Sequence, residues 1–254
     1  MAVLLLTYRC NSKCIMCDLP QRALKAVDPE YSTKQWKNII KQLADIHTGG
    51  IGFTGGEPLV RSDTPELITY AKSLGMATTL NTNAVLLHKE NIKKVLDSDP
   101  DNINISLDGI NKETYDFVRG TPNGFDRMTE NTKNLVAERS RLHKSVTITI
   151  VTCVSEYNID VLDKIYELAA DMGVDKIGFM PMHRIPDTKV YFNYKIRPMT
   201  CKSPKKNMGK LFREKLEIIK NKNLIPIDNS NEYLVMFPDA FNGKLFPLHC
   251  CAGY

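Results

Sequence analysis

Short apolar stretches alternate with longer amphipathic stretches along residues 3–180, and this alternation limits the folds open to the chain. Each apolar stretch has the length of a buried strand, and each amphipathic stretch repeats its apolar residues at helical spacing. Successive strand–helix units are typical of a parallel sheet with right-handed crossovers. Strands are expected at residues 3–8, 51–54, 77–80, 102–107, 146–152 and 176–180. Six units predict an α/β fold, a partial (β/α)6 barrel of the TIM type.

The ends of the predicted helices carry local signals. Ser32 and Gln35 have the spacing of a capping box, which begins a helix. Pro65 suits the first turn of the next helix. Gly75 and Gly173 each follow the last apolar residue of a helical stretch, where glycine is common. Further helices are expected at about 88–96 and 125–141.

The alternation stops after residue 180. The stretch 181–207 contains several prolines and an isolated Cys201, so we expect a connector there. Helical spacing then returns over 208–219, and a strand is predicted at 233–237. We therefore expect a core domain over 1–206, and a C-terminal part over 207–254 that contains a helix, a strand and the start of a further domain.

Composition narrows the class of protein. The hydrophobic share of 43% and the charged share of 25% are ordinary for a globular protein. The net charge of +5 is mild and its basic residues are scattered, which makes nucleic acid an unlikely partner. No stretch reaches the ~18 apolar residues of a membrane span. The apolar stretch at the start has no basic region before it, so we expect a cytoplasmic protein without a signal peptide.

A C-x3-C-x2-C run, formed by Cys10, Cys14 and Cys17, follows the first predicted strand. A structural zinc site would need a fourth ligand, and neither His47 nor His88 has an obvious route to this loop. A disulfide framework is disfavoured because the chain has an odd number of cysteines, seven. The spacing favours a [4Fe–4S] cluster held by three thiolates, with one iron left for an outside ligand.

A second cluster of unusual residues, Gly55-Gly56-Glu57-Pro58, follows the second predicted strand. Glycines permit close approach and expose backbone carbonyls, and proline fixes the turn. Carbonyls together with the Glu57 carboxylate would suit a positively charged amine. An α-amino acid group could then chelate the open iron through its amine and carboxylate. Because both clusters follow strands of one barrel, we expect them at the same edge of the sheet.

These two motifs resemble those of the radical S-adenosylmethionine (SAM) enzymes, and the resemblance extends over about residues 3–180. It implies that the three cysteines hold a [4Fe–4S] cluster and that SAM binds its fourth iron. It also implies that one electron from the cluster cleaves SAM to methionine and a 5′-deoxyadenosyl radical, which abstracts hydrogen from the substrate. An external one-electron reductant of the flavodoxin or ferredoxin type would supply the electron.

The resemblance also implies roles for further residues. Gly55, Gly56, Glu57 and Pro58 would form the turn that holds the SAM amine, and Met16 would contact adenine. Positions that bind the SAM carboxylate or ribose in the family match three residues: Asn83, Ser106 and Arg119. Asp108 and His183 lie at strand ends and are candidates for contact with substrate or for proton transfer.

The C-terminal residues, Cys250-Cys251-Ala252-Gly253-Tyr254, resemble the opening of a SPASM or twitch extension, which carries auxiliary clusters. We expect a fragment in which Cys250 and Cys251 lack the partners of an auxiliary cluster, and whether these two cysteines or Cys201 bind metal is left open. The predicted substrate is a peptide, a protein side chain or a cofactor precursor. The alternatives are a nucleotide cyclase of the molybdenum-cofactor type and, in another class, a non-catalytic zinc-binding module.

Overall fold

A computed structural model describes the chain except for residues 18, 20–28, 183–206 and 242–254. Its centre is a six-stranded parallel sheet in which the strands follow one another in chain order. The strands are β1 (Ala2–Leu5), β2 (Gly50–Thr54), β3 (Ala77–Thr82), β4 (Asn102–Ser106), β5 (Thr147–Val154) and β6 (Lys176–Pro181). The predicted partial (β/α)6 barrel is confirmed, although the first strand is shorter than the expected 3–8.

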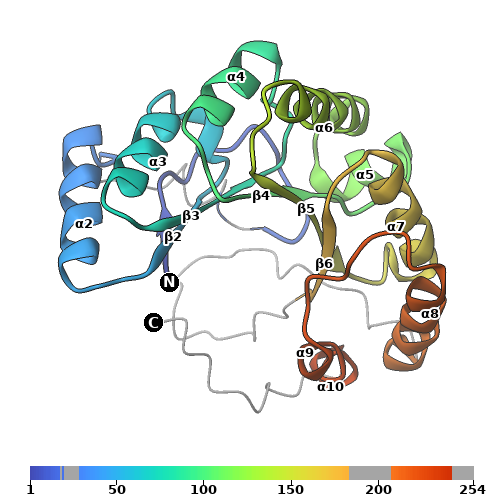
Figure 1. Cartoon of the computed structure of the whole chain (residues 1–254). Coiled ribbons are helices and arrows are strands. Elements are labelled where there is room, and N and C mark those ends of the chain that lie inside the picture. Colours follow the sequence, from blue (N-terminus) through green and yellow to red (C-terminus); the bar gives the residue numbers. More distant parts are fainter. Residues whose placement is uncertain (18, 20–28, 183–206, 242–254) are drawn as a thin grey trace.

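Helices connect the strands and lie along one side of the sheet, as Figure 1 shows for α2, α3, α4, α6 and α7. The crossover helices are α2 (Thr33–Asp45), α3 (Thr64–Ser73), α4 (Lys89–Asp97), α5 (Lys112–Arg119), α6 (Gly124–Arg141) and α7 (Leu162–Asp171). Two short 3-10 turns, η1 (Pro58–Val60) and η2 (Ile159–Val161), precede α3 and α7. The C-terminal helices are α8 (Met208–Lys222), α9 (Asn231–Leu234) and α10 (Phe237–Phe241).

Local sequence signals account for several helix ends. Ser32 and Gln35 form the predicted capping box at the start of α2. Pro65 lies in the first turn of α3. Gly75 and Gly173 follow α3 and α7 with φ angles of +77° and +76°, which glycine adopts without steric cost.

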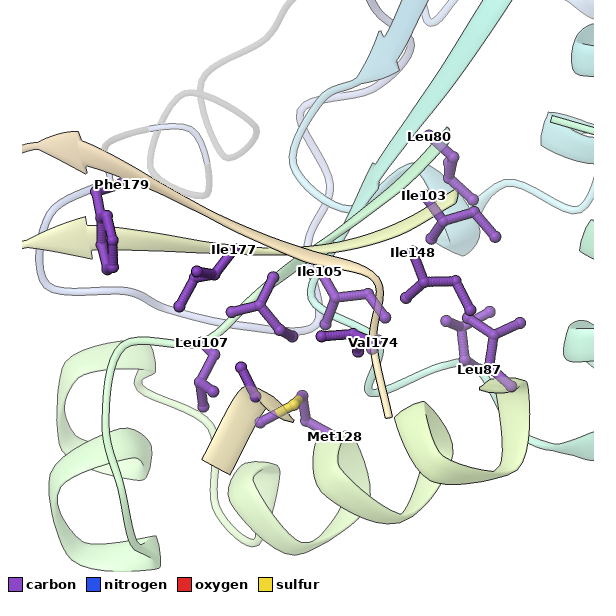
Figure 2. Close-up of a cluster of buried hydrophobic side chains, with 14 of the residues drawn as sticks. Leu80, Leu87, Ile103, Ile105, Leu107, Met128, Ile148, Val174, Ile177 and Phe179 are labelled. Carbon is purple, nitrogen blue, oxygen red and sulfur yellow. The ribbon is translucent and has the colours of Figure 1, made fainter. Parts of the chain in front are cut away.

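The core fills the space between the sheet and its helices (Figure 2). Ile103, Ile105, Ile148 and Ile177 point from the strands toward Met128 of α6, and all five side chains are fully buried. Burial of such a side chain stabilises the fold by about 1.5–3 kcal/mol. Because of this packing, the loops at the edges of the sheet are attached to a rigid scaffold.

The other face of the sheet is more polar. Because successive residues of a strand point to opposite faces, the half-buried residues that alternate with the core positions share this face. They include Thr79, Asn81, Asn104, Ser106, Val151 and Cys153. In a barrel this face lines the interior, next to the loops at the carboxyl ends of the strands.

The C-terminal helices pack against the last strand–helix unit. Phe212 of α8 stacks on Phe237 at a ring-centroid distance of 4.4 Å and meets Phe179 of β6 edge to face. Lys215 of α8 forms a 2.7 Å ion pair with Asp163 of α7. Residues 208–241 are therefore packed onto the barrel.

The strand predicted at 233–237 is wrong. These residues belong to α9, the turn after it and the start of α10, and the hydroxyl of Ser230 caps α9 by accepting the N–H of Tyr233. Residues 233–237 form an unbroken apolar run, but Val235 is 70% exposed while Leu234, Phe237 and Phe241 are buried. The buried positions follow helical spacing.

Within the residues that the structure describes, no helix is long and apolar enough to cross a membrane.

Candidate active site

Cys10, Cys14 and Cys17 lie on the loop that follows β1, at the carboxyl edge of the sheet. Their side chains are half-buried and form no disulfide. The N–H of Cys17 donates to the carbonyl of Cys14 at 3.1 Å, and the N–H of Ser12 donates to the Cys10 sulfur at 3.3 Å. These bonds fold the loop into a compact turn with its thiols on one short segment.

The thiols of Cys14 and Cys17 lie near enough to Cys10 for their charges to act on its pKa. Burial, together with the smaller effects of the Glu57, Cys14 and Cys17 charges, raises the pKa of Cys10 to about 11, against the Ser12 N–H, which lowers it. Thiols in such a place release their protons when a metal binds, because metal ligation favours the thiolate.

The turn after β2 fits tightly against the end of β1. The N–H groups of Gly56 and Glu57 donate to the carbonyls of Thr7 at 2.7 Å and Arg9 at 2.9 Å. A Cβ on Gly55 or Gly56 would lie 2.6 Å or 2.1 Å from these same carbonyl oxygens, so only glycine fits at either position. In the described part of the chain, no backbone N–H donates to the carbonyls of Gly55 and Gly56. These acceptors suit the amine that the sequence predicted.

The Glu57 side chain, which the sequence predicted to help hold an amine, is buried and hydrogen-bonded within the protein. It is 1% exposed, and its carboxylate accepts hydrogen bonds from the N–H of Leu59, the hydroxyl of Thr82 and the N–H of Asn83 at 2.7–3.1 Å. Burial raises the pKa of Glu57 to about 7, although these donors and Arg119 lower it. Glu57 thus ties the turn to the end of β3, and Pro58 starts η1 beside it.

Asn83 follows β3 and holds the cysteine loop. Its Nδ2 donates to Asn11 Oδ1 at 2.8 Å and to Ser12 Oγ at 3.1 Å, and its Oδ1 accepts the N–H of Val85 at 3.0 Å. Both polar atoms of this buried side chain are therefore engaged. A ribose hydroxyl could still donate to the second lone pair of Oδ1.

The end of α5 docks on the same loop, a contact that the sequence did not reveal. The N–H groups of Lys13 and Ile15 donate to the carbonyls of Arg119 at 3.2 Å and Val118 at 2.9 Å. Gly120 then turns the chain with a φ of +57°, and a Cβ there would lie 2.2 Å from the Lys13 oxygen. Only glycine combines this backbone angle with this approach.

Two signals could have indicated α5 beforehand. Asn111 is its N-cap and accepts the N–H of Thr114 at 2.9 Å, and Gly120 is its left-handed C-cap. Thr121, just beyond, donates to the Ser12 hydroxyl at 2.7 Å. Asn11, Ser12, Gly120 and Thr121 are thus loop-positioning residues that motif matching left out.

Asp108 and Arg119 form a buried ion pair at the end of β4. Arg119 Nη2 lies 2.5 Å from Asp108 Oδ2, and Arg119 Nη1 lies 3.9 Å from the Cys14 sulfur. The second oxygen of Asp108 accepts the N–H of Cys153 at 2.8 Å, and its side chain is fully buried. Asp108 therefore binds Arg119 and β5. Its position at a strand end had indicated contact with a substrate or proton transfer, but its buried side chain does not lie open to a substrate.

The structure describes two of the remaining predicted site residues, Met16 and Ser106. Met16 is half-buried within the cysteine loop, and Ser106 is the last residue of β4, half-buried on the interior face. His183 lies outside the described residues, as do Cys201, Cys250 and Cys251.

The donor set fits an iron–sulfur cluster. It offers three thiols on one segment, a backbone N–H and a guanidinium directed at two of the sulfurs, and unpaired carbonyls on the neighbouring turn. Among the described residues, no three His, Cys, Asp or Glu side chains are close enough together to cage a single ion.

The fold and this loop define a partial (β/α)6 barrel that carries three cysteines at the carboxyl edge of its sheet. The sequence model described as Radical SAM superfamily matches residues 4–169, which is well over half of the chain. The chain therefore belongs to the radical SAM superfamily. The enzymes of this family use a [4Fe–4S] cluster and SAM, so these are the cofactors of the present enzyme.

Curated relatives share about a third of their aligned residues with the chain. The Fe-coproporphyrin III synthase of Methanosarcina barkeri is 32% identical over 174 residues, which is 68% of this chain and 42% of the relative. The PqqA peptide cyclase of Bradyrhizobium diazoefficiens is 31% identical over 178 residues, covering 70% of this chain and 45% of the relative. The chain thus spans less than half the length of these relatives.

Solved structures share the fold. SuiB of Streptococcus suis bound to S-adenosylmethionine aligns with a TM-score of 0.67 and 17% identity, over 93% of this chain and 51% of SuiB. Native anSMEcpe with bound AdoMet aligns with a TM-score of 0.64 and 19% identity, over 89% of this chain and 63% of that protein. At these identities the likeness establishes the fold alone.

Proposed function

We propose that the protein holds its [4Fe–4S] cluster on Cys10, Cys14 and Cys17 and cleaves SAM reductively to act on a peptide. The observation that carries this proposal is the docking of the cysteine loop between the Gly55–Gly56 turn and the end of α5. When bound, the reduced cluster supplies the electron that releases methionine and a 5′-deoxyadenosyl radical from SAM. A flavodoxin or ferredoxin type of partner would deliver that electron.

The chain's own residues would position SAM around the open corner of the cluster. The unpaired carbonyls of Gly55 and Gly56 would accept hydrogen bonds from its ammonium group. The Arg119 Nε–H has no partner among the described residues, and with Ser106 it would bind the carboxylate. Met16 would pack against adenine. The buried surroundings of these groups would exclude water from the radical.

The interior face of the sheet supports a peptide as the substrate. Asn81 Nδ2 donates to the Phe53 carbonyl at 3.3 Å, and Asn104 Nδ2 donates to Asn81 Oδ1 at 3.0 Å. This row of carboxamides offers the donors and acceptors that a peptide backbone uses. Similarity to a PqqA peptide cyclase points the same way, as does the fold of SuiB, which has been solved with its precursor peptide SuiA.

A second candidate is a cofactor precursor as the substrate, since an Fe-coproporphyrin III synthase is among the similar proteins. No observation on the described residues favours a nucleotide substrate of the molybdenum-cofactor type. Membership of an enzyme family removes the non-catalytic zinc module.

Anaerobic reconstitution with iron and sulfide tests the proposal. We expect about four irons per chain and an electron paramagnetic resonance (EPR) signal of the reduced cluster that changes when SAM is added. A strong reductant should then give 5′-deoxyadenosine and methionine in equal amounts. The Cys14→Ala variant should lose both cluster and cleavage, and Cys153→Ala, a change in β5 away from the cysteine loop, should keep the cluster. Zinc in place of iron, or no 5′-deoxyadenosine from the loaded protein, would refute the proposal.

A further inference from the structure

The contact between Arg119 and the Cys14 sulfur places a cation next to one of the proposed cluster ligands. Arg119 Nη1 is directed at the sulfur from 3.9 Å, which is within hydrogen-bonding reach of sulfur. Residue 119 is more than a hundred positions from residue 14 in the chain, so the contact depends on the tertiary fold. Two backbone hydrogen bonds between the loop and the end of α5 hold the two segments together.

Asp108 fixes the orientation of this guanidinium. Its Oδ2 lies 2.5 Å from Arg119 Nη2, and its Oδ1 is held by the Cys153 N–H at 2.8 Å. With one side of the planar guanidinium bound to Asp108, Nη1 is left to point at Cys14. Asp108 is completely buried, and only 14% of the Arg119 side-chain surface is exposed.

The Asp108–Arg119 pair lies among buried side chains and has little access to solvent. Tyr115 packs beside it, fully buried, with a hydroxyl that has no hydrogen-bond partner among the described residues. Burial raises the pKa of Tyr115, with further increases from Asp108 and Cys14, while Arg119 lowers it. In such surroundings a charge acts on its neighbours more strongly than it does in water.

We propose that Arg119, held in place by Asp108, is a positioning residue that donates to the Cys14 thiolate and sets the reduction potential of the cluster. This inference rests on the proposed binding of the cluster by Cys14. A hydrogen bond and a positive charge at a ligand sulfur stabilise the cluster with the additional electron, so they raise its potential. Arg119 would therefore ease the transfer of one electron from the reductant to the cluster.

The inference gives Arg119 a role before SAM arrives. A contact with the SAM carboxylate would use the unpaired Nε–H, whereas Nη1 and Nη2 already bind Cys14 and Asp108. One guanidinium could thus join the cluster ligand to the bound substrate. The two roles are separable because the first is measurable without SAM.

The test is an anaerobic redox titration of the cluster-loaded protein without SAM, followed by EPR. In Arg119→Gln we expect the ratio of reduced to oxidised cluster at a given solution potential to fall about tenfold, which is about 59 mV for a one-electron couple. Arg119→Lys keeps the charge but cannot bind Asp108 and Cys14 together, so its potential should fall by less. The matched control is Arg141→Gln, which removes an exposed cation at the far end of α6.

The outcomes separate the two proposals. A wild-type protein that forms no cluster contradicts the proposed function itself. A loaded wild type and Arg119→Gln with the same potential, or a shift no larger than that of Arg141→Gln, overturns the inference and leaves the proposed function standing. Partial loss of the cluster in Arg119→Gln does not affect the comparison of potentials, because the midpoint potential does not depend on the fraction of chains that carry a cluster. If Arg119→Gln retains no cluster, an unchanged potential in Arg119→Lys overturns the inference.

Discussion

The Nδ2 atom of Asn83 lies 2.8 Å from Oδ1 of Asn11, so the end of β3 is bonded directly to the loop that carries the cysteines. Glu57 binds the backbone N–H of Asn83, and Ser12 binds its side chain as well as the hydroxyl of Thr121. A continuous chain of buried hydrogen bonds thus runs from the turn after β2 through β3 and the loop to α5. The bonds fix where the cysteines can lie.

Asn83→Ala should loosen this chain. The change removes three hydrogen bonds, takes one donor each from Asn11 Oδ1 and Ser12 Oγ, and leaves the buried N–H of Val85 without the oxygen that accepts it. We expect the free energy of unfolding to fall by about 2 kcal/mol or more, and the iron bound per chain to fall with it. Denaturant unfolding and iron analysis measure the two effects.

Asn91→Ala is the control for this change, because Asn91 makes one hydrogen bond, to the Leu86 carbonyl at 2.8 Å, away from the loop. It should cost about 1 kcal/mol and leave the iron content unchanged. An Asn83→Ala protein that retains iron as well as Asn91→Ala would show that the bonds to Asn11 and Ser12 do not position the cysteines.

Gly120→Ala should displace the cysteine loop. Gly120 and Gly75 both have positive φ, at +57° and +77°, but a Cβ at Gly75 meets nothing within 4 Å, whereas one at Gly120 meets the Lys13 oxygen. Gly75→Ala should therefore cost about 1–2 kcal/mol from the backbone angle alone. Gly120→Ala should cost about 1–3 kcal/mol more and lower the iron content. Equal losses in both variants, with iron retained, would contradict the docking of α5 on the loop.

Local patterns explain what could be predicted from the sequence. The strand–helix alternation, the capping box at Ser32 and the glycines after α3 and α7 depend on residues close in the chain. The cysteine spacing likewise lies within one segment. Such signals do not require knowledge of which segments meet in space.

The contacts that shape the site join distant segments, and the sequence did not show them. The α5 helix is amphipathic, with Tyr115 and Val118 buried, but this pattern does not say which segment the end of the helix contacts. Its docking on Lys13 joins the loop after β1 to the segment after β4, which are far apart in the chain. Glu57 matched a motif, but its orientation follows from donors supplied by Thr82, the last residue of β3, and Asn83, which follows it. The sequence could therefore indicate which residues belong to the site, but it could not indicate which side chains they contact.

Stability should depend on pH through Glu57. Its pKa in the folded chain is raised from 4.5 to about 7, so the folded state binds more protons than the unfolded state between these values. The free energy of unfolding should therefore fall as pH rises through this window, by about 3 kcal/mol from this carboxyl. Denaturant unfolding of the wild type and Glu57→Gln, from about pH 5 to about pH 8, measures the difference.

In Glu57→Gln this fall should be absent, so the variant should gain stability relative to the wild type as pH rises. The control is Glu138→Gln, which removes an exposed carboxylate whose pKa is lowered by Arg141. The stability of Glu138→Gln relative to the wild type should not rise with pH in this window. Parallel pH profiles for the wild type and Glu57→Gln would mean that the carboxylate is fully compensated by the donors of Leu59, Thr82 and Asn83.

SAM should stabilise the chain only when the cluster is present. The carbonyls of Gly55 and Gly56 offer the ammonium group two acceptors, but the proposed chelation adds the open iron, which the cluster-free chain lacks. At a SAM concentration of about a hundred times Kd, the loaded protein should gain about 2.7 kcal/mol. Cys17→Ser, which removes one of the three thiols, should show little gain at the same concentration. Thermal unfolding under anaerobic conditions measures both proteins, and an equal gain in both would mean that SAM is held by the turn and Arg119 without the iron.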